Sequence, residues 1–293
     1  MPKTQYTSKK FSGPTLDIID SANNIIEEYE ADGLDLTLRQ LYYQFVSRDL
    51  LSNTQKSYNR LGRIISDARL AGLVDWGAIK DRGRNLRENQ HWENPGQIIR
   101  AAARGFQIDH WKGQEFRPEV WIEKEALVGV IGSVCEDLDV SYFACKGYVS
   151  QSAMWEAAQR FDKYHNEGQT PVIIHLGDHD PSGIDMTRDI LDRQEILRGC
   201  YSVERIALNM DQIEDYKPPP NPAKLTDSRC NGYVEKYGSN SWELDALEPR
   251  TLRELIKRTV LGFRDDSIYE DVREKEYGYL DILRHIEENW QSL

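Results

Sequence analysis

Apolar residues recur every three or four positions in the N-terminal part of the chain, which is the spacing of one buried helix face. This pattern predicts α-helices over residues 14–31, 38–51 and 54–73. Asp32-Gly33 ends the first helix, and Thr37 is a typical N-cap for the second. A short segment punctuated by glycine follows at 74–86. Helix, short turn, helix and tail together predict a winged helix-turn-helix domain.

From residue 119 onward the pattern changes to short apolar runs that alternate with helical segments. The runs predict strands over residues 119–123, 140–146, 170–178 and 203–210, with helices at 124–138, 150–168 and 182–199 between them. This alternation predicts a central parallel sheet flanked by helices. A proline-rich loop at 211–229 and helical segments at 242–263 and beyond complete the chain. We therefore expect an α/β protein with a helical domain at 1–91, a connecting helix and linker at 92–118, and a sheet domain at 119–293.

Carboxylates follow two of the predicted strands. Glu123 ends the first strand, and Asp178 and Asp180 come directly after the third in the stretch HLGDHDPSGIDM. The carboxyl ends of parallel strands meet at one sheet edge, where ligands bind in such folds. Clustered carboxylates repel each other unless a cation lies between them, and oxygen ligands suit Mg²⁺. The sequence thus predicts a magnesium site, with His179 turned away from it toward solvent or a phosphate.

The composition is that of an ordinary globular protein: 39% of the 293 residues are hydrophobic and 29% are charged. No segment approaches the ~18 uninterrupted apolar residues of a membrane span, so we expect no membrane partner. The N-terminus lacks an apolar signal core, and the four cysteines form no CxxC pair. We therefore expect reduced thiols and a cytoplasmic location.

The net charge of −12 argues against a nucleic-acid partner, but its distribution is uneven. Residues 39–104 contain twelve Lys and Arg residues and only six Asp and Glu residues. Lys56, Arg60 and Arg63 are spaced to share one helix face, and Arg82 and Arg84 lie in the basic tail. These five residues are candidates for contacts with the phosphates of double-stranded DNA. A solvated helix face without a ligand is the alternative interpretation.

Five segments resemble, in the same order, the motifs of the A subunit of type IIB DNA topoisomerases and of the related meiotic double-strand-break protein. They are RQLYY (39–43), IEKEA (122–126), CKGY (145–148), DHDPSGI (178–184) and WELDAL (242–247). The resemblance implies a winged-helix domain followed by a Toprim domain. The sequence departs from the family at Val149-Ser150, where the family usually has Pro-Asp, and this leaves the role of that loop open.

The resemblance also implies a chemistry. Tyr43 falls on the position of the nucleophile that attacks a DNA phosphate and forms a 5′-phosphotyrosyl link. A phenol with an ordinary pKa of about 10 needs a nearby cation, and Arg39 lies one helical turn away. Tyr42 is expected to pack in the core. Glu123 is the expected catalytic carboxylate, and Glu123, Asp178 and Asp180 are the expected Mg²⁺ ligands.

The family further implies a homodimer in which the tyrosine of one protomer meets the metal site of the other. The short N-terminal region leaves little room to dock the family's ATPase B subunit, so a B-type partner stays uncertain. The chain is similar to compact, stand-alone A-subunit-like proteins of mobile elements and viruses, with a nucleoid-associated location. Two alternatives stay open: a Toprim nuclease that uses water as its nucleophile, and a winged-helix DNA-binding protein without catalysis.

Overall fold

The structure is a computed structural model that describes residues 3–31, 33–34, 36–79, 91–200, 202–223 and 229–289. Three helices form the N-terminal unit, as the apolar spacing predicts: α1 (Gly13–Ala31), α2 (Leu38–Ser47) and α3 (Gln55–Leu70). Thr37 caps α2 in a capping box with Gln40, and Thr54 caps α3. The three helices enclose their own core, which includes Tyr29 and Phe45.

The predicted wing is not established. Residues 80–90, which include Arg82 and Arg84, lie outside the described residues. In the part of the tail that is described, Ile79 forms an isolated parallel bridge with Leu36. The described part of the N-terminal unit is therefore three helices packed on one another, and its classification as a winged helix-turn-helix stays a prediction.

The predicted parallel sheet is confirmed. Its strands are β1 (Phe116–Ile122), β2 (Ser141–Ala144), β3 (Thr170–Leu176) and β4 (Val203–Ala207), all parallel and in the order β2-β1-β3-β4. β1 begins three residues earlier than the sequence indicates. Pro118 is tolerated in this central strand because β1 pairs there with β3 alone, and the ladder to β2 starts at Glu119.

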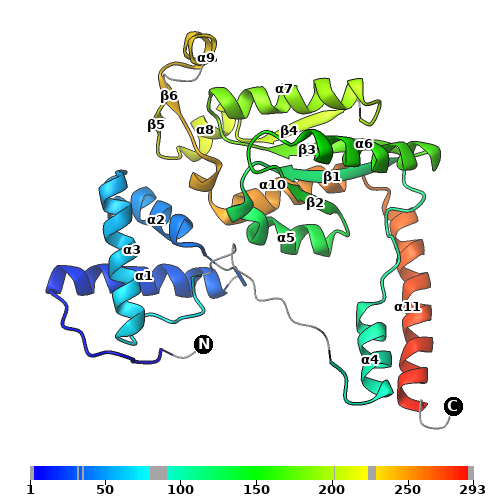
Figure 1. Cartoon of the computed structure of the whole chain (residues 1–293), viewed down its shortest axis with the longest axis horizontal. Helices are drawn as coiled ribbons and strands as arrows, with labels where there is room; N and C mark the ends of the chain where they lie inside the picture. Colours follow the sequence, from blue (N-terminus) through cyan, green and yellow to red (C-terminus); the bar gives the residue numbers. More distant parts are fainter. Residues whose placement is uncertain are drawn as a thin grey trace.

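Helices cover both faces of the sheet (Figure 1). They are α5 (Val128–Asp137) and α10 (Pro249–Gly262) on one face, and α6 (Gln151–Asn166) and α7 (Pro181–Ile196) on the other. Side chains alternate along β1: Val120 and Ile122 enter the core with α5 and α10, whereas Trp121 enters the core with α6. The central strands β1 and β3 are buried on both faces, which matches their continuous apolar sequences, whereas the edge strand β2 is partly exposed.

Shorter elements connect these layers. They are η1 (Glu125–Leu127), α8 (Met210–Tyr216), β5 (Asn221–Pro222), α9 (Cys230–Tyr237), β6 (Asn240–Ser241) and η2 (Leu244–Ala246). Two predicted boundaries are wrong here. The last strand ends at Ala207 because Asn209 caps α8, and the predicted helix 242–263 becomes η2 followed by α10, which starts at Pro249.

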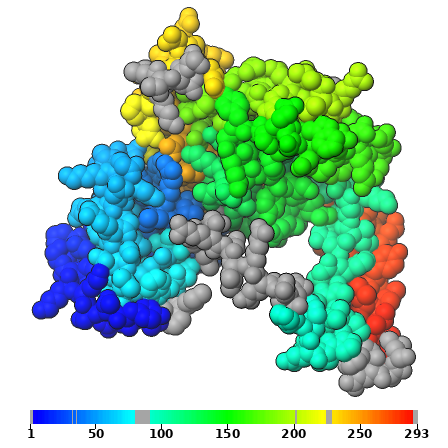
Figure 2. Space-filling model, viewed as in Figure 1, coloured from blue at the N-terminus to red at the C-terminus, as the bar shows by residue number. Residues whose placement is uncertain are grey.

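Two further helices, α4 (Pro95–Gly105) and α11 (Asp266–Asn289), lie side by side as an arm that extends from the sheet domain (Figure 1). Figure 2 shows the arm and the N-terminal helices as separate lobes beside that domain. The N-terminal unit touches the sheet domain where α2 packs on η2. No helix of the described residues is long and apolar enough to cross a membrane.

Candidate active site

Glu123 and Asp178 meet at the carboxyl edge of the sheet, as predicted. β1 and β3 pair in register up to Ile122 and Leu176, so the residues that follow lie next to each other. The backbone N–H of Asp178 donates to Glu123 Oε2 at 2.8 Å. Gly177 leaves room for these groups, since a Cβ there would lie 3.1 Å from Glu123 Oε2 and 3.1 Å from an Arg205 nitrogen, and both side chains would have to shift.

Asp180 lies at the same edge, but its side chain caps a helix. It is the N-cap of α7, and its Oδ1 accepts the N–H of Gly183 at 2.7 Å and the hydroxyl of Ser182 at 3.0 Å. A Cβ at Gly183 would lie 2.2 Å from the Asp178 carbonyl oxygen, which explains the glycine in DHDPSGI. The structure thus brings the three predicted carboxylates to one edge but turns Asp180 into the helix.

The carboxylates do not fit a metal ion as they stand. Among the described residues, no group of three or more His, Cys, Asp or Glu side chains is arranged to hold one. Asp180 is committed to its cap, and the ammonium of Lys124 lies 3.0 Å from Asp178 Oδ1. The negative charge of Asp178 is therefore already neutralised by the Lys124 side chain.

Lys124 is the centre of a buried ionic cluster. Its Nζ lies 3.0 Å from Asp178 Oδ1, 3.2 Å from Glu243 Oε2 and 3.6 Å from Asp245 Oδ2. Burial disfavours the charged ammonium, but the carboxylates of Asp178, Asp245 and Glu243 outweigh it and raise the pKa of Lys124 above its ordinary value. The cluster therefore keeps its cation throughout the physiological pH range.

An isolated antiparallel bridge carries Glu243 and Asp245 to this place. The backbones of His179 and Trp242 exchange hydrogen bonds of 2.8 and 2.9 Å, and the Leu244 N–H then donates to Asp178 Oδ1 at 2.7 Å. The same bridge buries His179, whose Nδ1 lies 2.7 Å from the Tyr233 hydroxyl. The expectation that His179 faces solvent or a phosphate is therefore wrong.

Tyr43, the predicted nucleophile, reaches the cluster from α2. Its hydroxyl donates to Glu243 Oε2 at 2.9 Å, and Arg39 lies 3.3 Å from the same oxygen and 3.6 Å from Asp245 Oδ2. Burial and the Glu243 carboxylate raise the pKa of Tyr43 above its ordinary value, against the opposing effects of Arg39 and Lys124. Tyr43 is thus joined to Asp178 of its own chain through Glu243 and Lys124.

Tyr42 takes the packing role expected of it. Its ring lies in the core of the N-terminal unit, and its hydroxyl accepts the Thr54 N–H at 2.7 Å. Beside the two tyrosines opens a polar pocket of about 350 Å³. The pocket is lined by Arg39, Tyr42, Tyr43, Asn53, Thr54, Gln55, Tyr58, Asn221 and Glu243. The predicted nucleophile therefore borders a space between the helical unit and the β5–β6 segment.

The candidate DNA contacts on α3 are exposed. Lys56, Arg60 and Arg63 all lie at the surface of this helix, at the spacing that gives one face.

Several residues of the site were not singled out by the sequence. Glu243 and Asp245 repeat the two-residue spacing of Asp178 and Asp180 inside the WELDAL segment, which was the available signal. No sequence signal pointed to Arg205, because it lies within a mainly apolar strand. Its guanidinium donates to the carbonyls of Gly177 at 2.9 Å and Asp178 at 2.7 Å. Burial lowers the pKa of Arg205 to about 10, although Glu123, Asp178 and Asp180 oppose this.

No protein-family model matches the chain, and no curated protein is significantly similar to it.

Stability should depend on pH through Glu123 and Asp178. Burial and their mutual repulsion raise the pKa of Glu123 to about 7, and burial raises that of Asp178 to about 6. The folded state therefore holds protons that the unfolded state has released, so the free energy of unfolding should fall as pH rises from about 4 to about 7. Glu123→Gln should raise the free energy of unfolding at pH 8 by about 1–3 kcal/mol and have little effect at pH 4.

Urea unfolding of the wild type and Glu123→Gln across this pH range measures the difference. Glu125→Gln is the matched control, because Glu125 is half-exposed and pairs with Lys146 at the surface. A difference between wild type and Glu123→Gln that stays constant with pH would contradict the raised pKa.

Removing the Lys124 charge should destabilise the protein strongly. Lys124→Met keeps the chain length of the side chain but leaves Asp178, Glu243 and Asp245 without their shared cation. We expect a loss of about 3–5 kcal/mol in the free energy of unfolding, the cost of an uncompensated buried charge. Lys146→Met, at an exposed ion pair, should change it by less than about 0.5 kcal/mol. Equal effects in denaturant titrations would show that the cluster is not a stabilising centre.

Proposed function

We propose that the chain cleaves and rejoins double-stranded DNA by tyrosine transesterification, in the manner of a type IIB topoisomerase A subunit. One observation carries the proposal. Tyr43 from the helical unit and Asp178 from the sheet edge, which belong to two separate sequence motifs, meet in one ionic cluster through Glu243 and Lys124. A shared site is what a Tyr nucleophile acting with a Toprim edge requires.

The proposed step exchanges one phosphoester for another. Tyr43 Oη forms a bond to a backbone phosphorus while the bond from phosphorus to the 3′-oxygen breaks, and the DNA 5′ end stays on the protein. Glu243 is placed to accept the phenolic proton, because it already accepts the hydrogen bond of Tyr43. Arg39 is placed to stabilise the charge of the attacked phosphate. Attack of the 3′-hydroxyl on the phosphotyrosine reverses the step and reseals the strand.

Mg²⁺ belongs to the proposal because the resemblance implies it, with Glu123, Asp178 and Asp180 as its ligands. It would supply positive charge at the phosphate. Binding would require Asp180 to leave its cap on α7 and Lys124 to release Asp178.

The proposal places the DNA along α3, where Lys56, Arg60 and Arg63 would neutralise phosphates, with Arg82 and Arg84 extending this surface. It describes a homodimeric, nucleoid-associated protein of the cytoplasm and assigns no ATPase B subunit.

A specific observation favours a second candidate, a Toprim nuclease that uses water. Tyr43 is 5% exposed, and its pKa is raised by burial and by Glu243, so its hydroxyl is a weak nucleophile as it stands. A third candidate, a DNA-binding protein without catalysis, is favoured by the existing contacts of the carboxylates, because Lys124 pairs with Asp178 and Asp180 caps α7.

Tyr43→Phe separates the first two candidates. The change removes one hydroxyl and keeps the ring, so folding and DNA binding should survive, whereas cleavage and every covalent adduct should be lost. Tyr42→Phe is the matched control, because Tyr42 lies in the helical core and should retain most activity. Two measurements are made after incubation with Mg²⁺ and a denaturant quench: cleavage of supercoiled plasmid, and retention of end-labelled DNA on the protein, compared with and without protease, which should release that DNA.

Protein linked to 5′ ends in the wild type and Tyr42→Phe, but not in Tyr43→Phe, is the expected result. Cleavage that persists in Tyr43→Phe without any adduct would establish the nuclease. No Mg²⁺-dependent cleavage by the wild type would favour the binding protein.

The double variant Arg60→Ala, Arg63→Ala should weaken DNA binding equally for all sequences. It should also reduce the slope of log affinity against log salt by about two, one for each lost phosphate contact. Arg273→Ala with Arg284→Ala is the control, because both lie on the distant α11. A salt slope that does not change would exclude this face of α3 as the DNA surface.

A further inference from the structure

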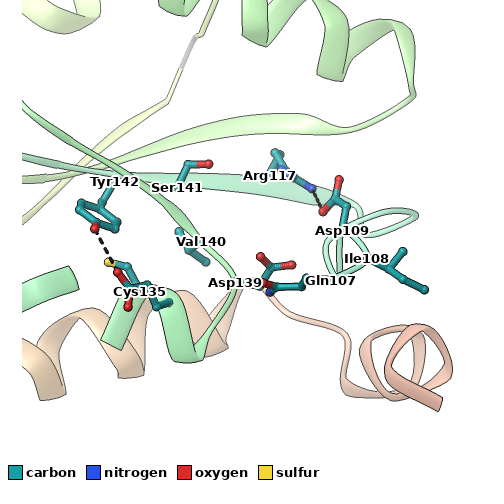
Figure 3. A pocket seen from close by; sticks show the side chains of 10 residues that line it. Gln107, Ile108, Asp109, Arg117, Cys135, Asp139, Val140, Ser141 and Tyr142 are labelled. Atoms are coloured by element: carbon teal, nitrogen blue, oxygen red, sulfur yellow. Dashed lines mark hydrogen bonds and ion pairs between the residues drawn. The ribbon is translucent and has the colours of Figure 1, made fainter. Parts of the chain in front are cut away.

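A cavity of about 570 Å³ lies between β2, the end of α5 and the segment that leads into β1 (Figure 3). Its charged side chains already have partners within the protein. Arg117 pairs with Asp109, and the Asp139 carboxylate accepts a backbone N–H at 2.8 Å. Glu136 accepts the Tyr142 hydroxyl at 3.2 Å. Among its described lining residues, this cavity therefore leaves no charged group free for a ligand.

The polar pocket of about 350 Å³ beside Tyr42 and Tyr43 differs in this respect. We call it the tyrosine pocket. Its volume is at the lower end of the roughly 300–1,000 Å³ of small-ligand sites. Three of its lining groups make no hydrogen bond with any described residue: Asn221 Nδ2, Gln55 Oε1 and the Tyr58 hydroxyl. These groups are open to a ligand.

Hydrogen bonds fix the orientation of the two amides. Asn53 Nδ2 donates to Asn221 Oδ1 at 3.1 Å, which leaves the Nδ2 donor of Asn221 free. Gln55 Nε2 donates to Asn59 Oδ1 at 2.9 Å, which leaves the Oε1 acceptor of Gln55 free. The half-buried ring of Tyr58 adds an aromatic surface. The tyrosine pocket thus combines an oriented donor from β5, an oriented acceptor from α3 and an aromatic ring.

The charges of the tyrosine pocket indicate which part of a DNA strand fits it. Among its described lining residues, only Arg39 and Glu243 are charged, and both lie at Tyr43. The rest of the pocket suits an uncharged planar group rather than a second phosphate. A nucleobase carries hydrogen-bonding groups on its edge and a face that stacks on aromatic rings. The DNA surface proposed along α3 also begins at this pocket, because Lys56 directly follows Gln55.

We propose that the tyrosine pocket holds one unpaired nucleobase next to the phosphate that Tyr43 attacks. Gln55 Oε1 and Asn221 Nδ2 bind the edge of the base, and Tyr58 stacks on its face. A paired base stays inside the duplex, so the nucleotide has to be unpaired or turned out of the helix to enter. The inference rests on the proposed function for its DNA substrate. It makes Gln55 and Asn221 specificity-determining residues.

Equilibrium binding without Mg²⁺ tests the pocket separately from cleavage. The full chain is titrated with five duplexes that differ only in one extra nucleotide of one strand, which carries one of the four bases or no base. At least one duplex with a base should bind about tenfold more tightly than the abasic duplex, because stacking and edge contacts need the base. Equal affinity for all five duplexes would overturn the proposal.

Two variants locate the base. Gln55→Leu and Asn221→Leu should each reduce the preference for the base at least about threefold, and leave the affinity for the abasic duplex unchanged. Gln55 is exposed, so Gln55→Leu keeps the test valid where Asn221→Leu, which breaks the bond to Asn53, disturbs the pocket. Asn166→Leu, on the distant α6, is the matched control and should keep the full preference. A preference that survives in both pocket variants would overturn the proposal.

This test and the Tyr43→Phe assay can fail separately. A preference for the base without any cleavage by the wild type would support the pocket and overturn the transesterase. Cleavage with a covalent adduct but without a preference for the base would do the reverse. No binding to any of the five duplexes would overturn both.

Discussion

The buried ammonium of Lys124 is the interaction on which the arrangement of this molecule depends. Asp178, Glu243 and Asp245 come from two parts of the chain that are distant in sequence, and they can lie together only around a cation. Because Lys124 directly follows β1, the cation is fixed to the sheet edge. The η2 segment must then lie against that edge, and α2 packs on η2. The Lys124 cluster thus joins the helical unit to the sheet domain, together with the hydrogen bonds Tyr29–Glu248 and Asn53–Asn221.

The same electrostatics explain why the site is stable and why it resists the proposed chemistry. Glu123 and Asp178 repel each other, and the cations near them, Lys124 and Arg205, are already held by protein groups. A metal ion would compete with Lys124 for Asp178, and Tyr43 would have to exchange Glu243 for a phosphate. The three candidate functions differ in which contacts must break. A transesterase would have to break both the Lys124–Asp178 pair and the Tyr43–Glu243 hydrogen bond. A nuclease would have to break only the Lys124–Asp178 pair, and a binding protein neither of them.

The sequence predicts this fold well where a local pattern is sufficient. The apolar runs predict the parallel sheet, and the register of β1 and β3 makes neighbours of Glu123 and Asp178. It fails where a distant segment decides the outcome. His179 is buried because Trp242 pairs with its backbone, and the roles of Glu243 and Asp245 depend on that same bridge. No local period encodes a pairing between residues so far apart.

The location of Tyr43 changes what a dimer has to provide. The resemblance implies that each tyrosine acts at the sheet edge of the partner, yet here Tyr43 reaches Glu243 and Lys124 of its own chain. A site assembled within one chain needs no second copy for completion. Cleavage of both DNA strands, however, needs two nucleophiles, and one chain carries a single Tyr43. Under the proposed function, the homodimer would therefore hold two complete sites, and the distance between them would set the distance between the cuts on the two strands.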